Sequence, residues 1–296
     1  MKIEKMIAVV IEKAERAPEI VRRYHKLGLK VMLSVYGGRM TGNLNCPNEM
    51  IDFIGEYISP EEALLEVLEF LETDENILFH IGSEYVLNTA DVNQLNALFN
   101  LGYSAVFFYY LPYDSVYRNF LYPLIGGCIG RPIPPPTAPF AISNDLYISR
   151  KESFLSGNSF YYAYNIFVFM ELSTTFEPSA GIFVELEKSL SEESYVQAFS
   201  AYLEYFPRWR LFEGEHRIHI VGMYEIKPRK PEREISLSQY ASLIEKLITG
   251  EYSFDHVREV MGDPMHINEM EYHRKLINEN KEEVISVIRR SSKTLF

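Results

Sequence analysis

Four apolar segments separated by helix signals occupy the first 110 residues, and this alternation limits the folds open to the chain. The segments are Met6–Ile11, Leu29–Val35, Asn76–Phe79 and Ser104–Tyr110. The first is apolar throughout and rich in β-branched residues, which suits a strand buried on both faces of a parallel sheet. Helices are expected between the segments, most clearly after Ser59, where Pro60 and Glu62 complete a capping box. The alternation predicts an α/β fold with a mainly parallel, mixed sheet flanked by helices.

The pattern is less regular beyond residue 130. Five prolines between Arg131 and Pro139 exclude a regular element there. A short strand is expected within Phe140–Ile148, before a helix that opens near Ser149. The aromatic run Phe160–Phe169 is expected to be a core strand rather than a platform for stacking bases. Two further strands and a helix are expected at Gly181–Glu185, Ile218–Met223 and Glu192–Phe206.

The aromatic residues divide the chain unevenly. Of the 41 Phe, Tyr and Trp residues, 36 precede residue 225, and such side chains supply the largest burial in a core. After Pro228 and Pro231 the sequence holds only helix patterns, the first of them capped by Ser236. We therefore predict a main domain over residues 1–230 and a helical C-terminal appendage over residues 231–296.

Composition and charge exclude several classes of protein. The chain has 296 residues, 47% hydrophobic and 24% charged, so it can bury a core and is not disordered as a whole. Two cysteines, Cys46 and Cys128, are too few for a disulfide framework or a multi-cysteine zinc site. The net charge of −12 argues against unaided binding to the phosphates of duplex DNA.

The sequence also lacks the signals of a membrane or secreted protein. No apolar run reaches the roughly 18 residues that a membrane span requires. The segment Ser159–Leu172 comes nearest, but it is shorter and Asn165 interrupts it. The first five residues alternate charged and apolar side chains and lack the apolar core of a signal peptide. These features predict no membrane span and a cytoplasmic location.

The common catalytic motifs are absent from the sequence. It has no Gly-x-Gly-x-x-Gly after the first apolar segment, no Walker loop, no Gly-x-Ser-x-Gly elbow and no His-Glu-x-x-His. Dinucleotide-dependent and ATPase activities therefore lose most of their support.

Several short segments resemble glycosyltransferases of the GT-A fold. These enzymes begin with an apolar strand, an Asn-Arg-like pair, a helix and a second strand, the order of Ile7–Ile11, Glu15-Arg16 and Leu29–Val35. Asn76–Asn88 (NILFHIGSEYVLN) has the shape of the family's strand that ends in paired acids. Phe140–Lys151 (FAISNDLYISRK) is similar to a later strand-to-helix segment. The resemblance covers about half of the chain and implies a GT-A-like domain that binds a nucleotide-sugar donor and an acceptor.

In that family an Asp-x-Asp motif holds the divalent metal that bridges the donor diphosphate. Gly82-Ser83-Glu84 stands at the matching place, with Glu84 as the one anionic ligand and Gly82 and Ser83 leaving room for a phosphate. The family often supplies a late histidine to the metal, so the resemblance adds His219 as a ligand. Mn²⁺ or Mg²⁺ is the cofactor that it implies. The plainer interpretation of His216 and His219 is one face of a half-buried strand.

Residues at the ends of the first strands are further candidates for binding the donor. Arg16 follows the first strand, at the edge where α/β sheets bind ligands, and could bind the diphosphate. Tyr36 and Gly37 end the second strand, where Tyr36 could stack on the base, and Arg39 is a second cation there. A cation must lie between Glu84 and a diphosphate, and Arg16 is the alternative to a metal. Each candidate also has a plainer interpretation. Arg16 could be an exposed arginine at the start of a helix, Tyr36 and Gly37 could form a simple turn, and Glu84 could be a surface acid.

Two aspartates are candidates for the catalytic base. If the reaction inverts the sugar, Asp114 or Asp145 could deprotonate the acceptor hydroxyl. Asp114 could equally form a loop turn. The acceptor stays open among a sugar, a lipid, a protein and a modified nucleic acid.

Two other functions stay open at this point. Leu29–Gly38 resembles the second-strand segment of family 18 chitinase-like barrels, which would make this a TIM-barrel protein acting on carbohydrate. The two carboxylates of that chemistry are missing from Ser104–Tyr113. The missing Asp-x-Asp motif favours the other alternative, a non-catalytic binding protein on a GT-A scaffold.

Overall fold

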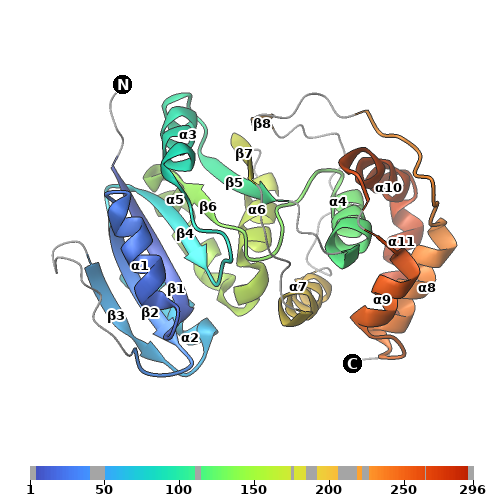
Figure 1. Cartoon of the computed structure of the whole chain (residues 1–296), viewed down its shortest axis with the longest axis horizontal. Coiled ribbons are helices and arrows are strands. Elements are labelled where there is room, and N and C mark those ends of the chain that lie inside the picture. Colours follow the sequence, from blue (N-terminus) through green and yellow to red (C-terminus); the bar gives the residue numbers. More distant parts are fainter. Residues whose placement is uncertain are drawn as a thin grey trace. The chain divides into compact units, whose positions relative to one another are not determined.

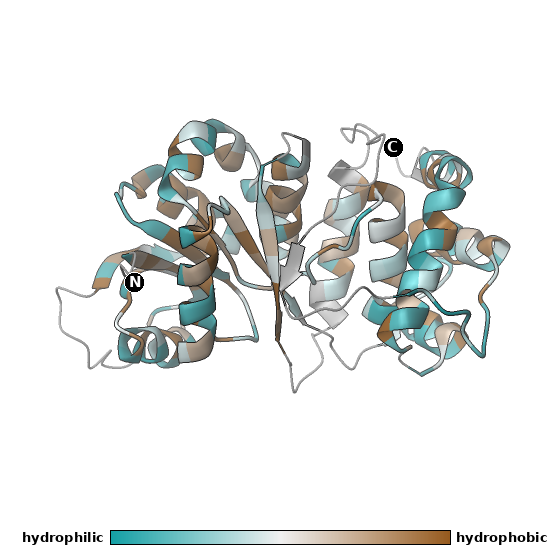
Figure 2. Ribbon diagram, turned by 90° about the horizontal axis from the view of Figure 1, so that it is seen from above, coloured by the Kyte–Doolittle hydropathy of each residue, from teal (hydrophilic) through white to brown (hydrophobic). Residues whose placement is uncertain are grey.

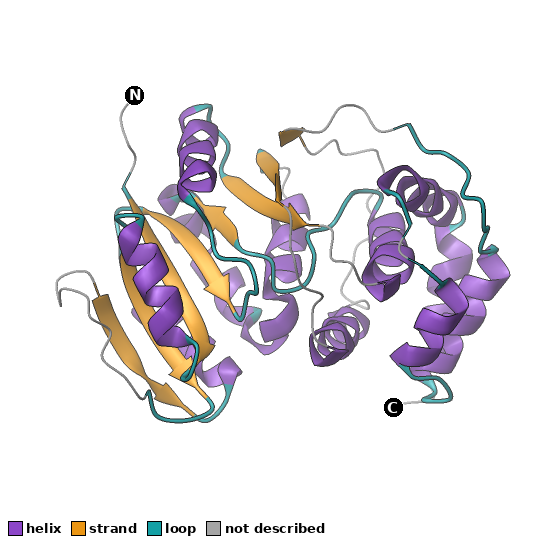
Figure 3. Cartoon of the chain, in the orientation of Figure 1, coloured by secondary structure: helices purple, strands orange, loops and turns teal. Residues whose placement is uncertain are grey.

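A computed structural model describes residues 5–40, 51–110, 115–174, 177–184, 192–205, 219–221, 227–263 and 265–292. Its contacts divide the chain into two units. The sheet unit comprises Met1–Tyr109, Pro136–Val184 and His219–Val221. The helical unit comprises Tyr110–Pro135, Glu185–Ile218 and Gly222–Phe296. Figure 3 shows the strands gathered in the first unit, whereas the second is built of helices.

The strands of the sheet unit are β1 (Met6–Lys13), β2 (Lys30–Tyr36), β3 (Ile51–Tyr57), β4 (Asn76–Ile81), β5 (Ala105–Tyr110), β6 (Phe140–Ile142), β7 (Ser179–Val184) and β8 (His219–Val221). Its helices are α1 (Ala17–Lys26), α2 (Pro60–Phe70), α3 (Thr89–Asn100), α5 (Asn144–Ser156), a 3-10 helix (Asn158–Ala163) and α6 (Tyr164–Thr174). Within the described ranges the eight strands form one sheet of order β3-β2-β1-β4-β6-β5-β7-β8 (Figure 1).

The first strands of the sheet are parallel. β1 lies between β2 and β4 and runs parallel to both, so Ala8 pairs with Val31 on one side and Leu78 on the other. β3 is parallel to β2, whereas β6 is antiparallel to β4 and β5. The predicted α/β fold with a mainly parallel, mixed sheet is confirmed. The TIM-barrel alternative is wrong, because the sheet ends at β3 and β8 instead of closing into a ring.

Helices cover both faces of the sheet. One core combines Val10 of β1 with Tyr24 of α1 and Leu95 of α3. On the other face Phe107 of β5 packs edge-on against Phe169 of α6, with ring centroids 5.1 Å apart. Figure 2 shows the apolar colour concentrated on the strands and the inner sides of these helices. Because successive side chains along a strand point to opposite faces, each strand contributes to both cores, one on each face of the sheet.

The aromatic run at residues 160–169 is helical, so the predicted core strand is wrong. It forms the end of the 3-10 helix and the start of α6. The run is apolar on every side, and Tyr161, Tyr164 and Phe167 are all buried. Periodicity cannot separate a buried helix from a buried strand in such a short segment.

The strand predicted within Phe140–Ile148 is shorter than expected, and the helix starts earlier. The hydroxyl of Ser143 accepts the backbone N–H of Leu146 at 3.3 Å, so Ser143 and not Ser149 caps α5. The structure adds β3, for which the sequence pattern had suggested no strand.

The helical unit contains a π-helical turn (Tyr117–Leu121), α4 (Tyr122–Ile129), α7 (Glu192–Tyr205), α8 (Leu237–Ile248), α9 (Phe254–Met261), α10 (Ile267–Glu279) and α11 (Lys281–Ser292). α4 packs so tightly on α10 that a Cβ at Gly127 would lie 2.6 Å from Cβ of Ile277. The buried side chain of Asn119 links the π-helical turn to the segment before α10, because its Oδ1 accepts a hydrogen bond from the N–H of Met265 at 2.9 Å.

The predicted boundary after residue 230 differs from the division by contacts. The C-terminal helices share their unit with residues 110–135 and 185–218, which lie inside the predicted main domain. Whether the C-terminal helices can be removed stays a prediction. No helix in the described part of the chain is both long and apolar enough to cross a membrane.

Candidate functional site

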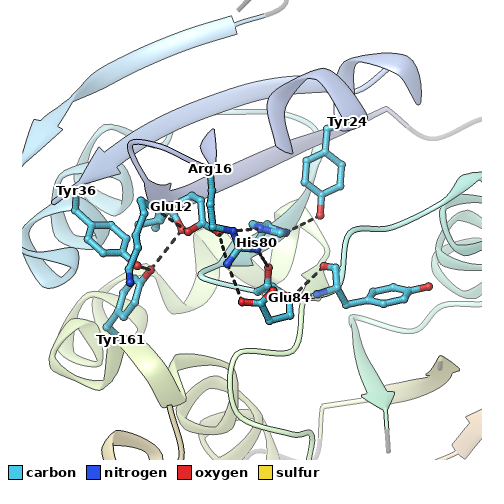
Figure 4. Close-up of polar contacts among 11 residues, drawn as sticks. Glu12, Arg16, Tyr24, Tyr36, His80, Glu84 and Tyr161 are labelled. Carbon is cyan, nitrogen blue, oxygen red and sulfur yellow. Dashed lines mark hydrogen bonds and ion pairs between the residues drawn. The ribbon is translucent and has the colours of Figure 1, made fainter. Parts of the chain in front are cut away.

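The order of the strands reverses between β1 and β4. From β1 the chain adds β2 and β3 on one side, and it then returns to form β4 on the other side. In open α/β sheets, ligands bind beyond the carboxyl ends of the strands at such a point. Because β1 and β4 run in the same direction, the residues that follow Lys13 and Ile81 meet at one edge. Figure 4 shows the polar residues that gather there.

Arg16 lies at this edge, between β1 and α1. Its backbone N–H donates to the carbonyl of Lys13 at 3.0 Å, and its own carbonyl accepts the N–H of Ile20 as α1 begins. The guanidinium reaches the loop after β4, where Nη1 donates to Oε1 of Glu84 at 2.8 Å. Nη2 donates to the carbonyl of Ser83 at 3.2 Å. The structure therefore brings together three residues that the sequence predicted at a donor site.

The loop after β4 is held by its backbone. Gly82 has φ of +55°, and its N–H donates to the carbonyl of Ile11 at 2.9 Å. A Cβ at this position would lie 2.9 Å from the hydroxyl of Tyr161, so both conformation and space favour glycine. The buried Ser83 hydroxyl accepts the N–H of Tyr85 and donates to its carbonyl, both at 3.1 Å. The side chain of Ser83 therefore stabilises the loop, whereas the backbone carbonyl of Ser83 accepts the hydrogen bond from Arg16.

Arg16 faces two carboxylates of different exposure. The Glu84 side chain is 40% exposed, whereas that of Glu12 is 1% exposed. Nη1 of Arg16 lies 3.7 Å from Oε2 of Glu12. If each group carries its ordinary charge, Glu12 and Glu84 contribute two negative charges and Arg16 contributes one positive charge. An anionic ligand at Arg16 therefore competes with a carboxylate, and the exposed Glu84 is the one that can turn to water.

Three buried polar residues behind Arg16 were not among the sequence candidates. The hydroxyl of Tyr24 lies 2.9 Å from Nδ1 of His80, and Nε2 of His80 lies 3.6 Å from Oε2 of Glu12. A signal for them was available, because Glu12 and His80 directly follow apolar runs that form buried strands. A polar side chain in that position needs a partner.

Tyr36 does not offer its ring to a base. The side chain is buried, and its hydroxyl lies 3.0 Å from that of Tyr161, with the two rings edge-on. Burial raises the pKa of the Tyr36 hydroxyl, so it stays neutral. Gly37 has φ of +74° and donates its N–H to the carbonyl of Tyr57, as a turn would. Arg39 is exposed beyond this turn.

Asp145 lies at the opposite edge of the sheet. β6 runs antiparallel to β4, so Ile142 pairs with Ile77 near the start of β4. The N–H of Asn144 then donates to the side chain of Asn76 at 3.3 Å. Asp145 follows at once, on the first turn of α5. As a base for a ligand at the carboxyl ends, Asp145 is therefore excluded.

His219 does not join Glu84. It opens β8, which lies four positions from β4 in the sheet. At the usual strand spacing this separates the two strands by about 19 Å. One ion cannot bridge them in this arrangement. Asp114 and His216 lie outside the described residues.

The residues at this edge do not fit Mn²⁺ or Mg²⁺. Across the parts of the chain that the structure describes, no three His, Cys, Asp or Glu side chains gather as a metal site would require. Glu84 is engaged by Arg16, whereas these ions prefer several oxygen ligands.

No protein-family model matches the sequence, and no curated protein matches it. Among solved structures, one similar chain is 4-diphosphocytidyl-2C-methyl-D-erythritol synthase from Anaerococcus prevotii. It is 15% identical, with 68% of this chain and 99% of that chain covered and a TM-score of 0.35.

Proposed function

We propose that the protein is a nucleotide-sugar-utilising transferase, specifically a glycosyltransferase, whose donor binds at the carboxyl ends of β1 and β4. The observation that carries the proposal is the guanidinium of Arg16, which lies where the strand order reverses. This is the position at which open α/β sheets bind nucleotides. A guanidinium can bind two phosphate oxygens at once, which suits a diphosphate.

Donor binding is then an exchange of anions on Arg16. The exposed carboxylate of Glu84 leaves, and a phosphate takes its place. The exchange needs no metal, because the cation beside the diphosphate is Arg16 itself. Glu84 acts as a competitor that keeps Arg16 paired while no donor is bound.

The transfer breaks the bond between the anomeric carbon of the sugar and the donor phosphate oxygen. A bond from the acceptor oxygen to that carbon forms, and the nucleoside diphosphate leaves with the electron pair. Arg16 stabilises the charge that grows on the leaving diphosphate. In an inverting reaction the acceptor proton passes to a base, for which Asp114 stays the candidate. We place the reaction in the cytoplasm, with the acceptor class open.

Calorimetric titration with a panel of UDP- and GDP-sugars tests the proposal. We expect the unmodified protein to bind at least one donor, with equal affinity in Mn²⁺ and in EDTA. Arg16→Ala should weaken that binding by roughly tenfold to a hundredfold, the usual effect of losing a charged hydrogen bond. Arg22→Ala is the matched control, because Arg22 is an exposed arginine on α1. If no donor binds, the proposal is wrong.

A non-catalytic binding protein is the second candidate. It is favoured by the position of Asp145, which leaves the carboxyl edge without one of its two expected bases. Release of nucleoside diphosphate from the same donor panel separates the two candidates. A donor that binds but yields no diphosphate with any acceptor class would favour the non-catalytic function.

A further inference from the structure

A line of polar groups runs from Tyr24 of α1, by way of His80 of β4 and Glu12 of β1, to Arg16 (Figure 4). The hydroxyl of Tyr24 meets Nδ1 of His80 at 2.9 Å, and Nε2 of His80 faces Oε2 of Glu12 at 3.6 Å. The same oxygen of Glu12 faces Nη1 of Arg16 at 3.7 Å. Tyr24, His80 and Glu12 are almost completely buried, so these groups have each other in place of water.

The contacts of His80 select the tautomer that its neutral ring would adopt. Burial raises the pKa of the Tyr24 hydroxyl, although a hydrogen bond with the backbone of Leu87 opposes the rise. Tyr24 therefore stays protonated and can donate to Nδ1. A neutral imidazole that accepts at Nδ1 has its hydrogen on Nε2. That hydrogen is on the nitrogen that faces Glu12.

Glu12 is held on one side and open on the other. Its Oε1 accepts the backbone N–H of Lys13 at 2.8 Å, which anchors the carboxylate at the end of β1. Its Oε2 makes no hydrogen bond within the described chain, and neither does Nε2 of His80. Oε2 therefore has an unused acceptor site between His80 and Arg16. A buried carboxylate is stable only if hydrogen bonds and a positive group such as Arg16 compensate it.

We infer that Glu12 is a positioning residue that holds Arg16 at the sheet edge while Glu84 leaves it. The inference rests on the proposed function only in naming a donor diphosphate as the group that replaces Glu84. Without Glu12, an Arg16 side chain released by Glu84 would keep only the hydrogen bond from Nη2 to the carbonyl of Ser83. With Glu12, the guanidinium also keeps a buried carboxylate beside Nη1 and presents its other face to the ligand.

Chemical modification of Arg16 by phenylglyoxal tests this without any ligand, with the rate followed by peptide mass spectrometry. Glu84→Gln alone should raise the rate by no more than about threefold, since Glu12 still holds the guanidinium. Adding Glu12→Gln should raise it by a further tenfold or so, in line with the loss of a charged partner. Adding Glu12→Asp instead of Glu12→Gln to the Glu84→Gln variant keeps the charge and should restore most of the protection of Arg16 from phenylglyoxal. Equal rates in the single and double glutamine variants would overturn the inference.

Glu15→Gln is the matched control, because it removes the same charge from an exposed residue beside Arg16. Tyr24→Phe in the Glu84→Gln background serves if Glu12→Gln does not fold. It removes the hydroxyl that bonds Nδ1 of His80, and we expect about a twofold to threefold faster modification. An unchanged rate would count against the line of contacts.

Titration with UDP and GDP separates the inferred role of Glu12 from the proposed glycosyltransferase function. We expect Glu12→Gln to weaken nucleotide binding by about tenfold and Glu84→Gln not to weaken it. If the unmodified protein binds neither these nucleotides nor any sugar conjugate of them, the proposed function is wrong. The modification rates still decide the role of Glu12 in that case.

Discussion

The two units each bury a histidine, and the two side chains have different surroundings. His80 of the sheet unit bonds Tyr24 and faces Glu12, in a line that ends at an exposed ion pair. His273 of the helical unit lies between the rings of Tyr240 and Tyr272, and neither of its nitrogens has a hydrogen-bond partner within the described residues. The polar partners of His80 connect it to a surface site. The burial of His273 among aromatic rings instead opposes its protonation.

Removing the helices around His273 should have the largest effect on this contrast. A chain that ends at Pro228 lacks α8 and α10, which carry Tyr240 and His273. We expect the sheet unit to keep a cooperative thermal transition, because its two cores include no residue after Val221. Circular dichroism melting measures this. Loss of any cooperative transition would show that the sheet unit depends on those helices.

Acid should destabilise the helical unit through His273. Burial lowers the pKa of His273 from 6.5 to about 4, so between these values the unfolded chain binds a proton that the folded chain does not. Stability is therefore full above pH 6.5 and falls as the pH drops towards 4, by about 3 kcal/mol from this group. Denaturant unfolding at pH 7 and at pH 4 measures the loss.

His273→Phe should flatten this part of the pH profile, because phenylalanine keeps a ring and cannot titrate. The same substitution at His25, a half-exposed residue on α1, is the control and should leave the acid sensitivity in place. An equally steep loss of stability in the His273→Phe variant would mean that other groups cause it.

The exposed ion pair of the sheet unit should matter for binding and little for stability. Glu84→Gln removes the competitor for Arg16, and we expect donor or nucleotide affinity to rise by about tenfold. Its cost to the free energy of unfolding should stay below about 1 kcal/mol, as for other exposed pairs. Calorimetry and melting on one preparation measure both. Weaker binding would mean that Glu84 contacts the ligand.

The smallest change expected is at Ser83. Ser83→Ala removes two hydrogen bonds to Tyr85 and should lower the free energy of unfolding by about 1 kcal/mol. Nucleotide binding should fall slightly, because the loop presents a carbonyl to Arg16. A large loss of binding without loss of stability would assign the hydroxyl itself to the ligand.

Local sequence signals predicted the first strands and their helices well. Apolar runs marked β1, β2, β4 and β5, and the cap at Ser59 marked the start of α2. The run at residues 160–169 failed, because a helix buried on every side has no polar stripe to reveal its period. β3 lies at the end of the sheet and is only partly buried, so its pattern was too mixed to identify.

The site was partly predictable for a different reason. Arg16 and Glu84 follow the ends of neighbouring parallel strands, so the order of elements was enough to suggest that they meet. Asp145 was misplaced because one strand, β6, runs in the opposite direction, and nothing in its three residues reveals that. Glu12 and His80 required the register, since their contact depends on which residues of β1 and β4 lie side by side.

The division of the chain has a consequence for biosynthesis. α4 is buried along its whole length, and α10, which packs on it, ends 150 residues after α4 does, at Glu279 against Ile129. At a synthesis rate of about 5–20 residues per second, α4 leaves the ribosome roughly 8–30 s before its partner helix is complete. During that interval the apolar surface that α4 buries against α10 is without its partner helix. Slowing translation after residue 130 should therefore increase aggregation of the newly made protein.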